Sequence, residues 1–233
     1  MALFVLGDTH LSEGCDKAMD VFGGAWRGYR EKLLAAMSAL LGPEDTLVLC
    51  GDISWGMTLS EALPDFALLD GLPGHKLLLK GNHDYWWETV SKMKCFFTEH
   101  GIHTLDFLHN NCFSYQDIAL CGTRGWFYDP NDPAACDDRI FKRELIRLEA
   151  SLKCGAALQK KEIFCFLHYP PVFSGSEVPQ ITALLRKYSV SRCFYGHLHG
   201  ESLRGAFSGQ MDGIVYRVVS ADALGFTPLR IAE

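Results

Sequence analysis

The stretch Leu77 to Trp87, LLLKGNHDYWW, is an apolar run that ends in Gly-Asn-His-Asp. An amide, an imidazole and a carboxylate in succession at the end of an apolar run either form a turn or bind a ligand. The sequence contains more runs of this kind. Four other apolar runs end at Asp8-Thr9-His10, at Asp52, at His168 and at His197-Leu198-His199.

The first half of the chain alternates short apolar runs with amphipathic segments. Residues 3–6, 46–50 and 76–79 are apolar at consecutive positions, which is typical of strands covered on both faces. Between them, residues 26–41 have apolar side chains at helical spacing, and 60–69 begins with a capping serine. This alternation predicts a parallel sheet with helical connections.

The second half predicts further elements of both kinds. Residues 112–122 are expected to form an antiparallel strand pair, and the tail after Glu201 is strand-rich. Helices are expected at 88–100, 138–160 and 179–188, and strands at 163–167 and 192–195. Since no repeat, low-complexity segment or linker-like tract interrupts the chain, residues 1–233 are interpreted as a single domain.

Composition narrows the classes of function. The chain has 233 residues and a net charge of −6, so it has no overall positive field and nucleic acid is a disfavoured partner. The nine cysteines are scattered and mostly lie beside apolar residues, which predicts free thiols in a reducing compartment. The first apolar run is too short for a signal peptide, and no run approaches the roughly 20 residues of a membrane span. We therefore expect a cytoplasmic protein without a membrane span.

The strand ends point to a metal site. The carboxyl ends of parallel strands meet at one edge of a sheet, where open α/β folds bind their ligands. Residues two apart in an extended segment project to the same side, so Asp8 with His10, and His197 with His199, are expected to converge. A lone histidine after a strand is more often a surface residue, and a lone Asp-x-His is often a turn. All five strand ends together are hard to attribute to chance, and imidazole and carboxylate ligands suit divalent first-row metals.

With these motifs, the sequence resembles the calcineurin-like metallophosphoesterase superfamily. The matching motifs are Asp8-x-His10, Gly51-Asp52, Gly81-Asn82-His83-Asp84, His168 and Gly196-His197-x-His199, in the family's order. The resemblance implies an α/β fold that is a four-layer α/β/β/α sandwich, with two mixed β-sheets packed face to face and helices outside. The strand-rich tail fits part of the second sheet.

The resemblance also implies the site and its chemistry. Two divalent metal ions (Mn, Fe, Zn, Co or Ni, with Mn or Fe favoured) would hold a bridging hydroxide that attacks phosphorus. His83 would protonate the departing oxygen. The alternative interpretation of His83 is a purely structural role in the turn. By position, Asp8, His10 and His199 would bind the first metal, Asn82, His168 and His197 would bind the second, and Asp52 would bridge the two.

Differences between these motifs and those of particular branches of the family narrow the class of substrate. The second motif continues as Ile53-Ser54-Trp55-Gly56-Met57, so it lacks the acidic residue and the arginine of the protein serine/threonine phosphatases. The ending Gly-Asn-His-Asp leans toward phosphodiesterases. We expect an enzyme, a hydrolase of a phosphodiester or phosphomonoester of small or medium size. The rival interpretations are a metal-dependent nuclease, which should have a basic groove, and a non-catalytic scaffold, which should have lost ligands.

Arg124 is a candidate contact for substrate. It lies in the Gly-bounded turn of the segment GTRGWFYDP, residues 122–130, and arginine is the natural bidentate partner of phosphate. A structural arginine in a tight loop explains the same pattern equally well. Four tryptophans near the motifs, Trp55, Trp86, Trp87 and Trp126, could stack on a substrate, although core packing is their more common role.

Overall fold

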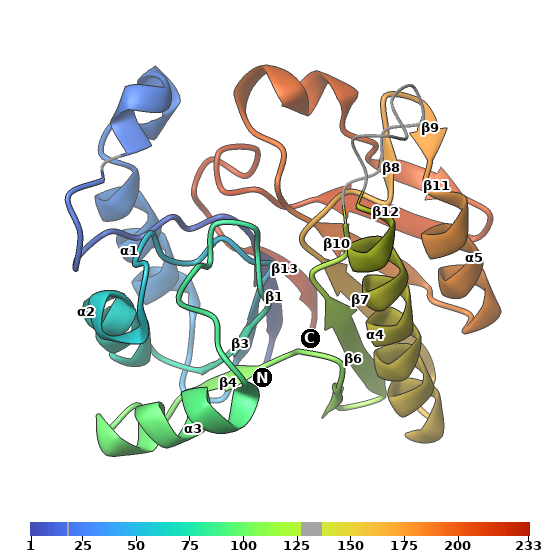
Figure 1. Ribbon diagram of the computed structural model, residues 1–233, viewed down its shortest axis with the longest axis horizontal. Helices are drawn as coiled ribbons and strands as arrows, with labels where there is room; N and C mark the ends of the chain where they lie inside the picture. Colours follow the sequence, from blue (N-terminus) through green and yellow to red (C-terminus); the bar gives the residue numbers. More distant parts are fainter. Residues whose placement is uncertain (18, 127–136) are drawn as a thin grey trace.

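The computed structural model describes residues 1–17, 19–126 and 137–233, and its architecture is α/β with two mixed sheets (Figure 1). The first sheet has the strand order β13-β1-β2-β3-β4, in which β1 to β4 are parallel and β13 is antiparallel to β1. Its strands are β1 (Leu3–Leu6), β2 (Thr46–Leu49), β3 (His75–Leu78), β4 (Leu105–Phe107) and β13 (Leu229–Ala232).

The second sheet has the order β11-β12-β10-β7-β6-β5. Its centre, β12-β10-β7-β6, is parallel, and an antiparallel strand borders it on each side. The strands are β5 (Cys112–Tyr115), β6 (Ile118–Thr123), β7 (Glu162–Leu167), β10 (Arg192–Tyr195), β11 (Gly209–Met211) and β12 (Ile214–Val218). A separate small hairpin joins β8 (Val172–Phe173) to β9 (Ser176–Glu177).

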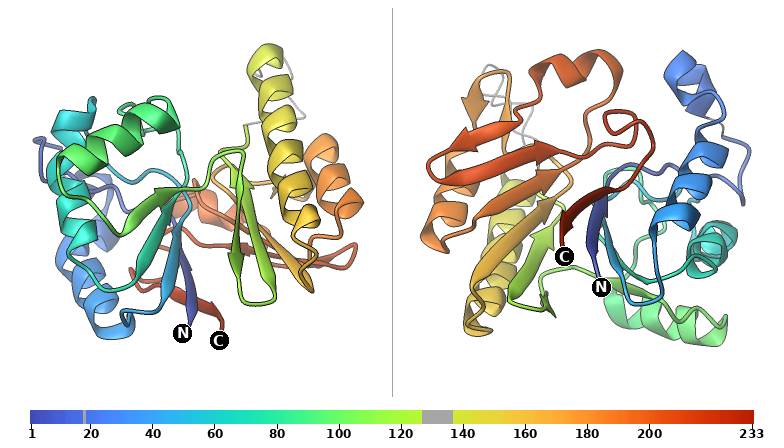
Figure 2. Two further views of the ribbon diagram at one scale, coloured as in Figure 1. Left: turned by 90° about the horizontal axis from the view of Figure 1, so that it is seen from below. Right: turned by 180° about the vertical axis from the view of Figure 1, so that it is seen from behind.

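Helices cover the outer faces of both sheets (Figures 1 and 2). The first sheet is covered by α1 (Tyr29–Leu40), α2 (Leu59–Asp70) and α3 (Val90–Glu99), and the second by α4 (Asp138–Ala157) and α5 (Pro179–Lys187). Short 3-10 segments lie at η1 (Met19–Phe22), η2 (Gly24–Trp26) and η4 (Gly200–Gly205). Within the described parts of the chain, none of the helices combines the length and the hydrophobicity that a bilayer-spanning segment requires.

Capping side chains define where several helices begin. The Thr58 hydroxyl accepts a hydrogen bond from the backbone N–H of Glu61 at the start of α2, and Asp137 accepts two at the start of α4. These acceptors satisfy N–H groups that have no partner inside the helix. The apolar faces of the helices then determine which side packs on the sheet.

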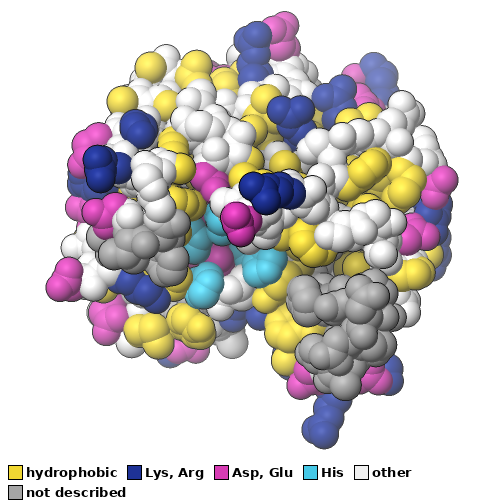
Figure 3. All heavy atoms as spheres, turned by 90° about the horizontal axis from the view of Figure 1, so that it is seen from above, with side chains coloured by type: hydrophobic (Ala, Val, Ile, Leu, Met, Phe, Trp, Pro, Cys, Tyr) yellow, Lys and Arg dark blue, Asp and Glu magenta, His cyan; other side chains and the backbone are white. Residues whose placement is uncertain are grey.

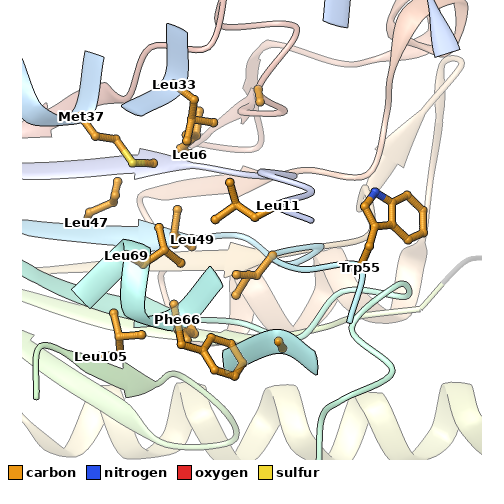
Figure 4. Packing of buried hydrophobic residues seen from close by; sticks show 14 of the residues in the cluster. Leu6, Leu11, Leu33, Met37, Leu47, Leu49, Trp55, Phe66, Leu69 and Leu105 are labelled. Atoms are coloured by element: carbon orange, nitrogen blue, oxygen red, sulfur yellow. The ribbon is translucent and has the colours of Figure 1, made fainter. Parts of the chain in front are cut away.

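Alternate residues of each strand belong to different layers of the core. Leu3 and Val5 of β1 pack with Phe164 and Phe166 of β7 in one cluster that draws on both sheets. Phe4 and Leu6 of β1 instead belong to the cluster that includes residues of the helices of the first sheet, and Figure 4 shows Leu6 beside Leu33. Both faces of these strands are therefore buried, which is why their sequences are apolar at every position. The expected α/β fold with two mixed sheets is confirmed.

Two features differ from the expectations. The tail supplies β11 and β12 to the second sheet, but β13 pairs with β1 in the first sheet, so the chain ends beside its own beginning (Figure 1). The expectation of free thiols holds for six described cysteines but is wrong for Cys112 and Cys154. These two form a disulfide that ties the border strand β5 to α4. Scattered spacing along the sequence could not reveal that α4 brings its cysteine onto β5.

Candidate metal centre

The seven predicted ligand residues lie together at the carboxyl ends of β1, β2, β3, β7 and β10. Figure 3 shows histidine side chains gathered in a hollow on this face of the molecule, with acidic side chains between them. Four of the seven are almost fully buried, namely Asp8, His10, Asp52 and His168. The other three, Asn82, His197 and His199, are partly buried.

The first group of candidate ligands is built on Asp8. Potential ligand atoms of Asp8, His10 and His199 all lie within 4.8 Å of one another. His199 Nε2 is 3.4 Å from Asp8 Oδ1, and the backbone N–H of His197 donates to the same carboxylate at 3.0 Å. The nitrogen His199 Nε2 is buried and makes no aligned hydrogen bond, so no other protein group within the described residues competes with a ligand for it.

The second group is built on Asn82. Its Oδ1 atom is 2.7 Å from His168 Nε2 and 2.9 Å from His197 Nδ1, and these two nitrogens are 3.3 Å apart. The other ring nitrogen of His168 lies 3.0 Å from the backbone carbonyl oxygen of Cys50. Because a carbonyl can only accept, Nδ1 of His168 carries the proton and Nε2 presents a lone pair. The lone pairs of His168 Nε2 and Asn82 Oδ1 therefore face each other and repel, and a cation between them would remove that repulsion.

Asp52 lies between the two groups. Its Oδ1 atom accepts a hydrogen bond from the backbone N–H of His83 at 2.8 Å, which fixes the orientation of the carboxylate. Its Oδ2 atom is 3.7 Å from His10 Nε2 and 3.6 Å from His168 Nε2. One carboxylate oxygen therefore faces a histidine of each group. The donor set of carboxylate, amide and imidazole atoms fits divalent first-row metals.

Asp222 is a functional candidate that the sequence interpretation missed. Its Oδ1 atom accepts from His199 Nδ1 at 2.9 Å, and its Oδ2 atom accepts from the backbone N–H of Gly200 at 2.9 Å. A carboxylate behind a histidine fixes the ring and its tautomer, as in many metal sites. Asp222 follows β12, a parallel strand whose carboxyl end lies on the same edge. Asp222 could have been identified by the same reasoning from polar residues at strand ends if β12 had been predicted as a separate strand within the tail.

The backbone explains how the side chains converge, and it corrects one expectation. We expected extended segments to align Asp8 with His10 and His197 with His199. This reason is wrong, because Asp8, His10 and His197 have φ values of 61°, 45° and 73°. Asp52 also has a positive φ, of 50°. Four candidate ligands thus occupy a left-handed conformation that residues other than glycine seldom adopt, and tight turns aim them at one point.

Two motif glycines allow the strand ends to approach each other. A Cβ atom on Gly81 would overlap Asp52 Oδ1, and one on Gly196 would overlap Asp8 Oδ2. Glycine is required at both positions because the carboxylates occupy the space that any side chain would need. These residues explain why the motifs read Gly-Asn-His and Gly-His.

Asp84, the last residue of the opening motif, organises the turns. Its carboxylate accepts hydrogen bonds from the backbone N–H groups of Asp52, Ile53, Ser54 and Gly81 and from the indole of Trp86, at 2.7–3.3 Å. Asp84 is fully buried. It ties the end of β2 to the end of β3, and so holds two candidate ligands in register.

Burial and charge shift the protonation of the site strongly. Burial raises the pKa of Asp52 to about 8, and the Asp8 carboxylate adds to this effect. Burial alone would lower the pKa of His199, but Asp8 and Asp222 outweigh it and raise the pKa to about 10. Burial lowers the pKa of His10 and of His168, so these imidazoles are neutral near pH 7. Without a metal, the site holds protons on Asp52 and His199.

His83 lies beside the ligands without joining either group. Its ring centre is 5.7 Å from that of His10 and 4.4 Å from that of Trp55. Burial is the main cause that lowers the pKa of His83, to about 4. The ring also borders a cavity of about 370 Å³ at the mouth of the site. That cavity is lined further by His10, Met19, Trp26, Trp55 and His199.

Arg124 has protein partners for both its backbone and its side chain. Its carbonyl oxygen accepts from the backbone N–H groups of His168 and Tyr169, both at 3.0 Å, which positions His168. Its guanidinium lies 3.6 Å from the Glu144 carboxylate of α4 and 4.6 Å over the ring of Trp126. These contacts agree with a structural role. The end of the same segment, residues 127–130, lies outside the described residues.

Several solved structures share this architecture. The protein of unknown function AQ665 from Aquifex aeolicus is 17% identical with a TM-score of 0.52, covering 98% of this chain and 95% of that one. The phosphopantetheinyl hydrolase PptH from Mycobacterium tuberculosis is 12% identical with a TM-score of 0.56, covering 99% and 95%. TT1561 of Thermus thermophilus is 10% identical with a TM-score of 0.55, covering 99% and 97%. At such low identity these similarities establish the fold alone.

No curated protein is similar enough to this chain to be matched. The model of the calcineurin-like phosphoesterases matches residues 1–201, a span that includes all five strand ends and all seven candidate ligands. Together with the two mixed sheets and the convergence of those ligands, this match is decisive. The chain belongs to the calcineurin-like phosphoesterase family.

Proposed function

We propose that the protein is a binuclear metal-dependent phosphoesterase that acts on a phosphomonoester or phosphodiester of small or medium size. The convergence of two adjoining ligand groups, with the Asp52 carboxylate between them, carries this proposal. Asp8, His10 and His199 would hold one ion, Asn82, His168 and His197 would hold the other, and Asp52 would contribute to both. Mn or Fe is favoured among Mn, Fe, Zn, Co and Ni. When bound, such ions act as Lewis acids that activate a water molecule and stabilise negative charge on phosphoryl oxygens.

The protein's own residues prepare the site for this chemistry. Asp222 and the carbonyl oxygen of Cys50 hold His199 and His168 with their lone pairs directed at the ligand positions. Asp84 fixes the turns that carry Asp52 and Asn82. The side chains are thus organised before substrate arrives, so little reorganisation is needed during reaction.

His83 is proposed as the proton donor to the departing alcohol. In hydrolysis a water molecule loses one proton to the solvent, its oxygen forms a bond to phosphorus, and the bond from phosphorus to the alcohol oxygen breaks. That oxygen takes a proton from the His83 imidazolium, and the imidazole then regains a proton from the solvent. The pKa of His83, about 4 before substrate binds, makes the ring neutral near pH 7. An anionic phosphoester beside the ring raises this pKa, because opposite charge favours the imidazolium. Substrate binding therefore favours the protonated form of His83, which is the form that can donate.

The remaining expectations belong to the same proposal. One guanidinium nitrogen of Arg124 lies 3.6 Å from Glu144, whereas its Nε makes no hydrogen bond within the described residues, so Arg124 is the weakest of the proposed contacts. A net charge of −6 supports a small substrate over nucleic acid. A cytoplasmic location fits the six described free thiols, and the disulfide between Cys112 and Cys154 counts against it.

The decisive experiment is a matrix of metals against substrates. Metal-free protein is reloaded with each of the five ions and assayed with an aryl monoester, an aryl diester, cyclic nucleotides, nucleotide pyrophosphates and single-stranded DNA. A phosphopantetheinyl diester is included because a structural neighbour is named for that activity. The Asp52→Asn variant is the control for contaminating phosphatases. Hydrolysis of a small ester that Asp52→Asn abolishes supports the proposal.

Two outcomes would overturn it. Cleavage of DNA alone would favour the nuclease interpretation. No activity on any substrate with any ion would favour a non-catalytic scaffold. Metal analysis of the reloaded protein separates these cases further, because a scaffold can still bind ions while a misassigned site would bind none.

A further inference from the structure

A cavity of about 370 Å³ opens directly beside the candidate metal ligands. It is bordered by His10, His83 and His199 on the side of the metal site, by Met19, Trp26 and Trp55 along its wall, and by Gly200 and Glu201 at the remaining side. Its size falls within the range of small-molecule sites, which begins at about 300 Å³. The cavity therefore holds a substituent of moderate size while the phosphoryl group lies at the ligands.

The wall of the cavity is a continuous arc of aromatic rings. The ring centres of His83 and Trp55 are 4.4 Å apart, those of Trp55 and His10 4.8 Å, those of His10 and Trp26 5.8 Å, and those of Trp26 and His199 5.3 Å. The two indoles are 6% and 3% exposed, so the cavity is where they can be reached. Such a wall offers ring faces and edges to an apolar, planar group.

Other side chains hold the two indoles from behind. Trp26 packs edge-on against Tyr29 and Phe226, with ring centres 5.3 and 5.2 Å away. Tyr29 also donates a hydrogen bond from its hydroxyl to the carbonyl oxygen of His10 at 2.7 Å. Lys17 Nζ lies 3.4 Å from the ring centre of Trp55. The cavity is thus built in advance, which lowers the entropic cost of binding a rigid group.

Trp55 adds a polar feature to this wall. Its indole N–H is buried and finds no acceptor among the described residues. A buried donor without a partner costs free energy, and an oxygen of a bound molecule would satisfy it. Trp87 has an equally unpartnered indole N–H but does not line the cavity, so it serves as a matched control.

The position of His83 indicates which part of a phosphoester lies in the cavity. This step depends on the proposed function, in which His83 protonates the departing oxygen. Because His83 borders the cavity, the alcohol attached to that oxygen must extend into it. The part of the substrate that stays on phosphorus lies on the other side of the ligands.

We propose that this cavity is the leaving-group site of the enzyme, and that it selects phosphoesters whose alcohol bears an aromatic or other planar apolar group. Trp26 and Met19 supply the apolar contacts. The Trp55 N–H donates to an oxygen of the substrate near the scissile bond. Phosphoesters with small polar alcohols, such as glycerol phosphates, leave the wall unfilled and are poor substrates.

The test compares two rigid ligands that differ by one fused ring. Binding of 2-naphthylphosphonate and phenylphosphonate to the Mn²⁺-loaded protein is measured by calorimetry, and hydrolysis of 2-naphthyl and phenyl phosphates and of their methyl diesters is measured beside it. The extra ring buries about 50 Å² of apolar surface, so the naphthyl compounds should be favoured roughly tenfold in Kd and in kcat/KM.

Substitutions in the cavity wall test which residues cause the preference for naphthyl compounds. Trp26→Leu and Met19→Ala should each reduce the naphthyl preference to about twofold, whereas Trp87→Leu should keep it. Trp55→Phe retains a ring but removes the donor, so it should weaken both phosphonates about fivefold without changing their ratio, and Trp87→Phe should not. Ratios within one variant are insensitive to partial loss of folded protein, and thermal melts check the fold of each variant.

The outcomes separate this inference from the proposed function. Hydrolysis of the esters without a naphthyl preference, or with a preference that survives both Trp26→Leu and Met19→Ala, would overturn the leaving-group site and leave the phosphoesterase intact. A tenfold preference in phosphonate binding with no hydrolysis of any ester would overturn the proposed activity and support a site for planar groups. Equal effects of Trp55→Phe and Trp87→Phe would refute the role of the indole N–H.

Discussion

Metal loading should release protons from the protein, in a number that depends on pH. The perturbation is the addition of a divalent ion to metal-free protein. In that protein the pKa of Asp52 is about 8 and that of His199 is about 10, so both groups are protonated at pH 7. A metal ion needs the lone pairs that these protons occupy. Loading therefore displaces them.

The magnitude follows from the two pKa values. At pH 7 Asp52 and His199 are both largely protonated, so filling the site should release about two protons from these side chains, in addition to any proton that a metal-bound water loses. At pH 9, Asp52 is largely ionised and the release should fall to about one proton, almost all from His199. The neutral imidazoles of His10 and His168, whose pKa values burial lowers, should release none. Because metal binding releases protons, the apparent affinity for metal should rise with pH.

The assay is calorimetric titration with Mn²⁺ or Zn²⁺ in pairs of buffers that differ in ionisation enthalpy. The dependence of the observed heat on the buffer gives the number of protons directly. In the Asp222→Asn variant the pKa of His199 should fall, because a carboxylate 2.9 Å from its Nδ1 loses its charge. Proton release at pH 9 should then drop below that of the wild type. Asp212→Asn removes a carboxylate that pairs with Arg186 at the surface and should change nothing.

The reasoning is refuted if loading at pH 7 releases no protons, or if the release does not change between pH 7 and pH 9. A release that is the same in Asp222→Asn and wild type would remove Asp222 from the site. A metal affinity that falls with rising pH would contradict the sign.

Three further predictions test other parts of the structure. His83→Ala should lower kcat by about 10²- to 10⁴-fold with metal content unchanged; element analysis showing lost metal would mean that His83 is a ligand. Asp84→Ala leaves five buried N–H donors without their acceptor, so urea denaturation should show unfolding free energy reduced by about 3 kcal/mol or more; a loss below about 1 kcal/mol would count against its organising role. Burial lowers the pKa of Lys76 to about 8, below its ordinary 10.5, so the unfolded chain binds more protons in that window and stability should rise with pH there. Lys76→Met should lack this rise, and an identical pH profile in both proteins would contradict the assignment.

Much of the candidate site could be predicted from local sequence. Runs such as Leu77 to Leu79 are apolar because both faces of the strand are buried, and polar side chains directly after them must lie at the strand end. Parallel strands bring those ends to one edge, so Asp8, Asp52 and Asn82 become neighbours although they are distant in the chain. The structure places all seven candidate ligands there, while their role as ligands remains a proposal.

Other features depend on contacts that no local pattern encodes. Asp8 and His10 lie close together as expected, but the extended backbone from which this was inferred is wrong, since both residues have positive φ. The turn at Asp52 has the same conformation, and it is held by hydrogen bonds to Asp84, from another strand end, and by the close approach of Gly81. An argument from backbone propensity considers only the type of the residue and not these distant contacts.

The parallel strands and the residue types at their ends can be predicted from the order of the amino acids, because burial on two faces and short strand-end motifs act over a few neighbouring residues. The folded chain alone reveals that Asp222 supports His199, that Trp26 and Trp55 border one cavity, and that Cys154 meets Cys112. Each of these is a contact between segments that are far apart in the chain. Such contacts follow from how the sheets and helices pack, and packing is a property of the whole chain.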